Sequence, residues 1–219
     1  MDSTNKEIDN AIRRAPGRPK TYTDAERRAA IVDVARRTFT EFGYLGTTTD
    51  EVAARCRISK QTLYKLFPSK SDIFLAVVRA HRRMMLDLPR PAEEDDPVET
   101  VLEKIFMIEI DQQAENERAA FIHAIVEESV SAPELSDILR REGVDLARRQ
   151  LAAWLDEQGS KGLLQLEDSE SAAQMLMDMM LGAVRPLGRI WDSRELRQEH
   201  LRRCLRVFIN GSRSAVSGT

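Results

Sequence analysis

The segment from Arg57 to Lys70, RISKQTLYKLFPSK, collects amine, amide and hydroxyl groups within a few residues of one another. Lysine ammonium groups attract phosphates and the acceptor atoms of guanine, and a glutamine amide can donate to and accept from one adenine. Threonine and tyrosine hydroxyls suit contacts to phosphates or bases. This chemistry indicates recognition of a nucleic acid, and its carriers are Lys60, Gln61, Thr62, Tyr64 and Lys65.

Residue patterns that support catalysis are missing from the sequence. It has no glycine-rich phosphate loop, no nucleophile motif and no spacing typical of a metal site. His81, His123 and His200 belong to separate predicted helices, and Cys56 and Cys204 are far apart. We therefore expect no enzyme, no cofactor and no metal site, although residues distant in sequence can still meet in space.

A short helix must present the polar segment. Ser59 is a candidate N-cap for a helix from Lys60 to about Phe67, and Pro68 disfavours helical backbone in the residue before it. Leu63 and Phe67, four residues apart, would face inward. The lysines, the amide and the hydroxyls would then point largely outward.

Two further helices are predicted before this one. The first begins with a capping box of Thr23 and Glu26 and ends near Gly43, and the second begins with Thr48 and Glu51. Three helices within about 45 residues, the last two joined by a tight turn, describe a helix-turn-helix unit. Its last helix lies in the DNA major groove with its N-terminal residues at base edges. The same pattern also fits an ordinary three-helix bundle with a polar surface.

The rest of the chain also has helical periodicity, so the predicted fold class is all-α with about nine helices. A segment rich in proline and acid, residues 88–97, predicts a domain boundary. Further helices are predicted over 69–85, 97–112, 116–130, 132–158, 169–190 and 193–210. The expected regions are a disordered basic arm, a DNA-binding domain and a second helical domain, over residues 1–20, 21–87 and 88–219.

Charge is distributed unevenly along the 219 residues. Residues 11–70 carry 13 Lys or Arg against 6 Asp or Glu, whereas residues 81–219 carry 18 against 26. This asymmetry favours contact with a polyanion through the N-terminal part alone, although solvated helix faces would give the same totals. The N-terminus lacks a signal-peptide core and no apolar run is long enough to span a bilayer, so we expect a cytoplasmic protein without a membrane partner.

The run from Ala30 to Phe74 resembles the DNA-binding domain of the TetR family of bacterial transcriptional regulators. The resemblance rests on Phe39, Gly43, Tyr44, Thr47, Thr48, Val52, Ala53, Ser59, Thr62, Leu63, Tyr64, Phe67, Lys70 and Ile73. It implies a homodimer that binds a roughly palindromic operator in double-stranded DNA, usually as a repressor. It also implies a response to a small-molecule effector.

The resemblance also implies roles for single residues. Positions matching Thr48, Tyr64 and Lys70 would contact phosphates. Bases would be read from the positions matching Lys60, Gln61, Thr62 and Lys65. The family usually has glycine where Arg57 stands, and a positive φ there would cost arginine roughly 1–2 kcal/mol. The candidate DNA-binding residues are Arg18, Lys20, Thr48, Thr49, Arg57, Ser59, Lys60, Gln61, Thr62, Tyr64, Lys65 and Lys70.

Arg57 and the N-terminal stretch with Arg18 and Lys20 each allow a second interpretation. Arg57 is either a strained residue that the turn tolerates or an additional phosphate contact. The stretch APGRPK, with Arg18 and Lys20, is similar to an AT-hook core and predicts an arm in the DNA minor groove. A solvated tail without contacts is the alternative reading of the same stretch.

By the same resemblance, residues 97–211 would sense the effector and form the dimer. The predicted helix 169–190 is apolar nearly all round, so it must be buried on more than one side. Candidate interface residues are Met175, Met179, Ala183, Leu201, Leu205 and Phe208. An adaptable pocket for an apolar or amphipathic effector would use Phe106, Phe121, His123, Trp154, Met177 and Met180, which also fit a plain core.

A helical module that binds an acidic protein partner is the alternative to DNA binding. Binding to DNA falls steeply with salt, with a log–log slope near −0.9 per phosphate neutralised, and it shows sequence preference. A protein partner does not require the latter. For a regulator, we expect the effector to shift the spacing of two recognition helices through the helix 69–85.

Overall fold

The computed structural model describes residues 23–91, 93–130, 132–182 and 191–212. Regular secondary structure in these ranges is entirely helical, in agreement with the all-α prediction. The elements are α2 (Asp24–Gly46), α3 (Thr49–Arg55), α4 (Lys60–Leu66), α5 (Lys70–Met85), α6 (Val98–Ile105), α7 (Gln112–Ser129), α8 (Pro133–Ile138), the π-helical turn η1 (Leu139–Val144), α9 (Asp145–Ser160), α10 (Ser169–Leu181) and α11 (Arg194–Gly211).

The helix starts in the N-terminal part follow the predicted caps. Thr23 and Glu26 form the reciprocal capping box at α2. Thr48, Ser59 and Ser69 each accept a backbone N–H from the third residue after them, at the starts of α3, α4 and α5. Such caps satisfy N–H groups that have no partner inside the helix, and this is why short helices can begin where they do.

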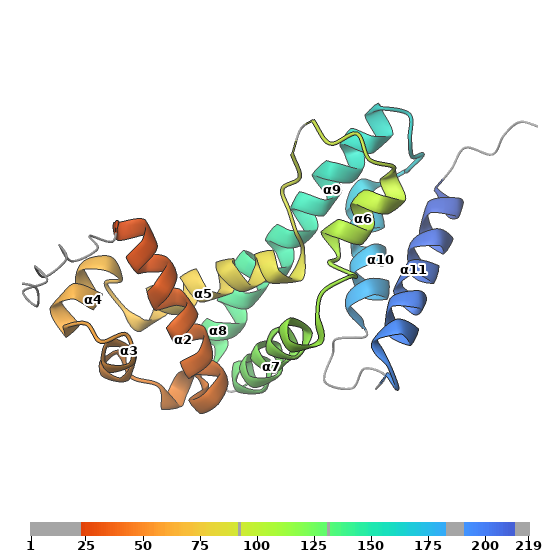
Figure 1. Cartoon of the computed structure of the whole chain (residues 1–219). Helices are drawn as coiled ribbons and strands as arrows, with labels where there is room; N and C mark the ends of the chain where they lie inside the picture. The colour runs from red at the N-terminus through yellow and green to blue at the C-terminus, as the bar shows by residue number, and fades with distance from the viewer. Residues whose placement is uncertain (1–22, 92, 131, 183–190, 213–219) are drawn as a thin grey trace, which may run out of the picture.

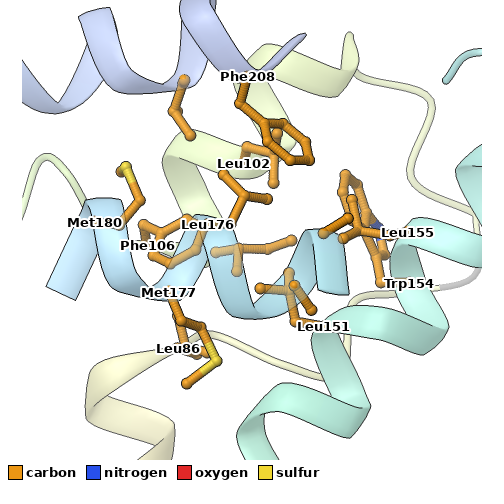
Figure 2. Close-up of a cluster of buried hydrophobic side chains, with 14 of the residues drawn as sticks. Leu86, Leu102, Phe106, Leu151, Trp154, Leu155, Leu176, Met177, Met180 and Phe208 are labelled. Carbon is orange, nitrogen blue, oxygen red and sulfur yellow. The ribbon is translucent and has the colours of Figure 1, made fainter. Parts of the chain in front are cut away.

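Two hydrophobic clusters organise the molecule. The front cluster takes residues from α2 to α5 and also from α7 and α8, including Phe121, Ile125 and Leu135. The back cluster takes residues from α6, α9, α10 and α11 (Figure 2), and also Leu86 and Leu88. The two hydrophobic clusters therefore do not follow the order of the chain, because α6 contributes to the back cluster before α7 and α8 contribute to the front cluster.

The two ends are joined by α5 and α7. Figure 1 shows α2, α3 and α4 at one end, the back helices at the other and α5 between them. Helix α2 packs on α5 and α7, while α10 packs on α9 and α11. No helix in the described ranges is long and apolar enough to cross a membrane.

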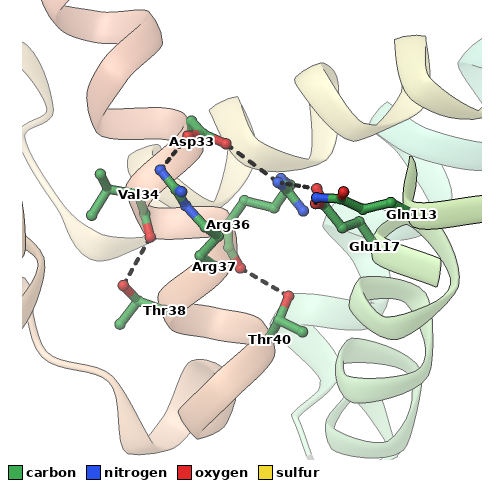
Figure 3. A network of polar contacts seen from close by, with 8 residues as sticks. All are labelled: Asp33, Val34, Arg36, Arg37, Thr38, Thr40, Gln113 and Glu117. Carbon is green, nitrogen blue, oxygen red and sulfur yellow. Dashed lines mark hydrogen bonds and ion pairs between the residues drawn. The ribbon is translucent and has the colours of Figure 1, made fainter. Parts of the chain in front are cut away.

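A polar network fixes α7 to α2 (Figure 3). The buried Arg36 guanidinium lies 3.3 Å from the Asp33 carboxylate on its own helix and 3.1 Å from Glu117 on α7. Thr38 and Thr40 donate to carbonyls one turn earlier, so their hydroxyls are satisfied within α2. A guanidinium with two carboxylates can be buried at this helix junction without leaving its charge unpaired.

Several boundaries differ from the sequence expectation. The predicted helix 97–112 ends at Ile105, because Met107 has a φ of 51° and closes the helix. The predicted helix 132–158 is built as α8, η1 and α9 in succession. Phe42, in the last straight turn of α2 before the kink at Gly43, is 46% exposed, and the Arg55 guanidinium lies 4.6 Å from the centre of its ring.

Candidate nucleic-acid interface

The turn between α3 and α4 is closed by two backbone hydrogen bonds. The Arg57 N–H donates to the Ala54 carbonyl at 3.0 Å, and the Ile58 N–H donates to the Ala53 carbonyl at 3.1 Å. This is the Schellman arrangement, in which the residue at the position of Arg57 takes left-handed backbone and is usually glycine. Arg57 has a φ of 55°, so the turn keeps the geometry of a glycine turn with an arginine in it.

Helix α4 separates its apolar and polar side chains cleanly. Leu63 is fully buried, and Leu66 and Phe67 are buried beside it. The opposite face exposes the side chains of Lys60, Gln61, Tyr64 and Lys65, with Thr62 half-buried. Because only one side of the helix packs on the front cluster, the other side is free to enter a groove of about the width of an α-helix.

The hydroxyl groups near α4 hold one another in place. The Tyr64 and Thr49 hydroxyls are 3.1 Å apart, which joins α4 to the start of α3. Ser59 accepts the Thr62 N–H at 3.0 Å, and the Ser59 and Thr62 hydroxyls lie 2.8 Å apart. Thr48 accepts the Glu51 N–H at 3.1 Å. These contacts bring together the candidates that the sequence placed on separate helices.

Lys60 has an acidic neighbour. Its ammonium lies 2.6 Å from the Asp50 carboxylate on α3, and this hydrogen bond raises the pKa of Lys60. Both side chains are more than half exposed. An exposed pair of this kind contributes little to stability, so the ammonium can exchange Asp50 for a phosphate or a base at small cost.

Lys70 is placed differently from the other candidates. Its ammonium donates to the Tyr44 and Thr47 carbonyls, both at 2.9 Å, and lies 4.2 Å from the centre of the Tyr44 ring. Burial lowers the pKa of Lys70. This half-buried lysine therefore closes the C-terminal end of α2, and the structure does not group it with the exposed face of α4. Arg18 and Lys20 lie outside the described residues.

One residue that sequence reasoning missed supports this region from α7. The Glu128 carboxylate accepts hydrogen bonds from the backbone N–H groups of Tyr44 and, at 3.3 Å, Leu45. Gly43, with a φ of 72°, creates the kink that exposes these two N–H groups. A side-chain Cβ at Gly43 would lie 2.2 Å from a Glu128 oxygen. The glycine signalled a break in the helix, but no spacing in the sequence connects this break to Glu128, which is 84 positions from Tyr44.

The predicted pocket residues do not form one group. Phe106, Trp154, Met177 and Met180 are buried together in the back cluster (Figure 2). Phe121 belongs to the front cluster, where its ring lies 4.5 Å from that of His81. His123 is exposed on α7, 3.6 Å from Glu127. The six residues therefore do not line a single pocket, because Phe121 and His123, two residues apart, lie on opposite faces of α7.

The predicted interface residues also divide into two sets. Met175 is 53% exposed on α10, and Met179 is half-buried beside it. Leu201, Leu205 and Phe208 are buried inside the same protomer, packed in the back cluster. They are therefore not available to a partner chain, while Ala183 lies outside the described residues. The outward face of α11 instead exposes Leu196 and Val207.

Comparison with known families covers both parts of the chain. The family model for bacterial regulatory proteins of the tetR family matches residues 31–77. The model for the C-terminal domain of AefR-like transcriptional repressors matches residues 100–210. A helix-turn-helix regulator from Mycobacterium tuberculosis is 28% identical over 156 residues, which is 71% of this chain and 73% of the relative.

Solved structures share the fold at low identity. TylP, a TetR regulator from Streptomyces fradiae, has a TM-score of 0.68 at 21% identity and covers 89% of this chain and 90% of its own. The flavonoid-responsive regulator FrrA has a TM-score of 0.62 at 23% identity, with 88% of this chain and all of its own covered. With the capped helix-turn-helix and the family matches over both parts, the chain belongs to the TetR family of bacterial transcriptional regulators and is a DNA-binding regulator rather than an enzyme.

Proposed function

We propose that the protein is a repressor that binds a palindromic operator as a homodimer and is released by a small-molecule effector. The observation that carries the DNA-binding part is the exposed polar face of α4, held out by the Ser59 cap and the closed turn at Arg57. Repression is supported by the match of residues 100–210 to the C-terminal domain of AefR-like repressors.

On the operator, α4 would lie in the major groove. Gln61 and Lys65 would read base edges, and the Tyr64 and Thr49 hydroxyls would contact the backbone phosphates. The exposed guanidinium of Arg57 lies in the turn before α4 and is available to a phosphate as well. Base contacts would determine which sequence is bound, and phosphate contacts would determine how tightly any sequence is bound.

Dimerisation would use the outward faces of α10 and α11. These helices pack side by side, and their outer surfaces expose Met175, Leu196 and Val207. A two-fold axis here would pair the same patch on both protomers. The two α4 helices would then stand about one turn of DNA apart, roughly 34–36 Å, or a multiple of it.

The effector would act by shifting a population of conformations. An apolar or amphipathic molecule would enter among the back-cluster residues Trp154, Met177 and Met180, where methionines can repack around it. Displacement of α5 and α7 would reach the front through the α2 contacts of both helices. The effector must bind the released conformation more tightly than the DNA-bound one, because otherwise no shift results.

The decisive experiment is selection of genomic fragments by the purified full-length protein. We expect enrichment of fragments that share an inverted repeat and lose affinity steeply with salt. Footprinting on the enriched fragment should protect two half-sites related by two-fold symmetry. Binding without any sequence preference would contradict the proposal and favour a partner that offers only negative charge.

A further inference from the structure

A groove of about 620 Å³ runs between α2, the end of α4 and α5. Its floor is apolar and includes the side chains of Val32, Leu75, Ala76 and Ala80, which are only partly covered. Cavities that hold small molecules usually measure about 300–1,000 Å³ and combine apolar walls with a few polar groups. The groove lies in the front of the molecule, away from the back cluster that is the proposed site of the effector.

The charges around the groove are unbalanced. Four arginines, Arg28, Arg36, Arg79 and Arg83, line it together with two acids, Asp33 and Asp72. The groove therefore has an excess of positive charge beside its apolar floor.

Two of these arginines already have partners outside the groove. Arg36 pairs with Glu117 at 3.1 Å, and Arg79 pairs with Glu142 at 2.9 Å. Arg28 lies over the Phe67 ring at 4.7 Å, and Arg83 is exposed on α5. Within the part of the chain that the structure describes, neither Arg28 nor Arg83 pairs with a carboxylate, so each can accept an external anion.

We infer that this groove binds an amphipathic anion, a molecule with an alkyl chain and a carboxylate head group. The alkyl chain would cover Val32, Leu75 and Ala76 and remove their apolar surface from water. The carboxylate would pair with the free guanidinium of Arg28 or Arg83, since guanidinium matches a carboxylate with two parallel hydrogen bonds. A ligand with the same alkyl chain but a neutral or cationic head group would make only the apolar contact.

The position of the groove gives such a ligand a direct effect on the recognition helix. Leu66, Phe67 and Pro68, the end of α4 and its link to α5, form part of the lining. A ligand bound in the groove would therefore favour one placement of α4 against α2 and α5. This effect on DNA rests on the proposed function, whereas the binding itself does not.

The test is calorimetric titration of decanoate into the full-length protein, with decanol and decyltrimethylammonium as neutral and cationic probes. Ala29→Trp places a large side chain in the groove from an exposed position on α2, and Arg83→Glu reverses a charge at its rim. Arg149→Glu makes the same charge change at an exposed position on α9. Circular dichroism checks that each variant keeps its helical content.

We expect decanoate to bind more tightly than either other probe, and both groove variants to weaken it by at least about tenfold. Arg149→Glu should leave the affinity unchanged. Absence of decanoate binding, equal binding of the cationic probe, or unchanged affinity in both groove variants would each overturn the inference. Selection of genomic fragments is performed without decanoate, so its outcome decides the proposed function separately.

Discussion

On α4 the side chains that face the solvent are amines, an amide and a phenol, whereas on α10 and α11 they include Met175, Leu196 and Val207. Both surfaces belong to helices that bury their other side in a hydrophobic cluster. The front surface suits a charged, hydrated partner such as DNA, and the back surface suits an apolar partner such as a second copy of the chain. The outward side of a helix therefore indicates the kind of partner, while its inward side only maintains the fold.

The largest effect should come from the inward side of α11. Leu205→Ala removes a fully buried side chain from the back cluster and should lower the free energy of unfolding by about 2–5 kcal/mol. Urea denaturation measures this loss. Val130→Ala, at a position that is 85% exposed, should change it by about 0.5 kcal/mol at most. Equal losses in the two variants would remove the distinction between inward and outward positions.

The outward side of α11 should matter for assembly instead. Val207→Glu places a charge at the proposed dimer interface and should raise the dimer dissociation constant about 100-fold, since an unpaired buried charge is costly. Sedimentation equilibrium measures this constant. Val130→Glu, the same change on an exposed position of the front, should have no effect. A dimer that survives Val207→Glu unchanged would place the interface elsewhere.

The front should also differ from the back in its response to acid. His81 is buried against Phe121, and burial, with Arg36 and Arg118 nearby, lowers its pKa to about 3. As the pH falls, His81 is protonated in the unfolded chain at about pH 6.5 but stays neutral in the folded chain. The free energy of unfolding therefore falls below about pH 6.5, by about 2 kcal/mol at pH 5. Urea denaturation at several pH values between about 5 and 7 should show that the free energy of unfolding depends less on pH in His81→Leu than in the wild type. His123→Gln, at an exposed position, should keep the wild-type dependence of stability on pH. An unchanged dependence in His81→Leu would show that His81 does not cause it.

Two variants on α4 distinguish the contacts that select a DNA sequence from the contacts that strengthen binding to any DNA. Gln61→Ala should cost about 1–3 kcal/mol on the preferred operator and relax the preference at one base pair. Tyr64→Ala removes a proposed phosphate contact and should weaken binding to all DNA sequences by a similar factor. Anisotropy titrations on operator and scrambled DNA distinguish these outcomes. Wild-type preference in Gln61→Ala would show that the recognition face is misassigned.

The smallest effect concerns the turn before α4. Arg57→Gly should raise the free energy of unfolding by about 1 kcal/mol, because glycine adopts a positive φ without strain. Thermal unfolding measures this gain. A simultaneous loss of DNA affinity would indicate that Arg57 also meets a phosphate. A less stable variant would mean that the arginine makes a favourable contact that outweighs the strain.

Local signals carried most of the fold prediction. The caps at Thr48 and Ser59 and the inward Leu63 depend on residues within one or two turns, and all three positions hold in the structure. The back was harder, because a helix such as α10 is apolar on several sides and its sequence does not indicate which side meets the protomer's own core. The contacts that Lys70 and Phe121 make were not predicted for a related reason, since their partners are distant in sequence.

The Glu128 contact has a consequence for measurements in solution. The amide protons of Tyr44 and Leu45 are hydrogen-bonded to a carboxylate on α7. Their exchange with deuterium therefore depends on where α7 lies, and not only on whether α2 remains helical. The exchange rates of these two amides therefore report whether α7 stays packed against the end of α2, without any change to the sequence.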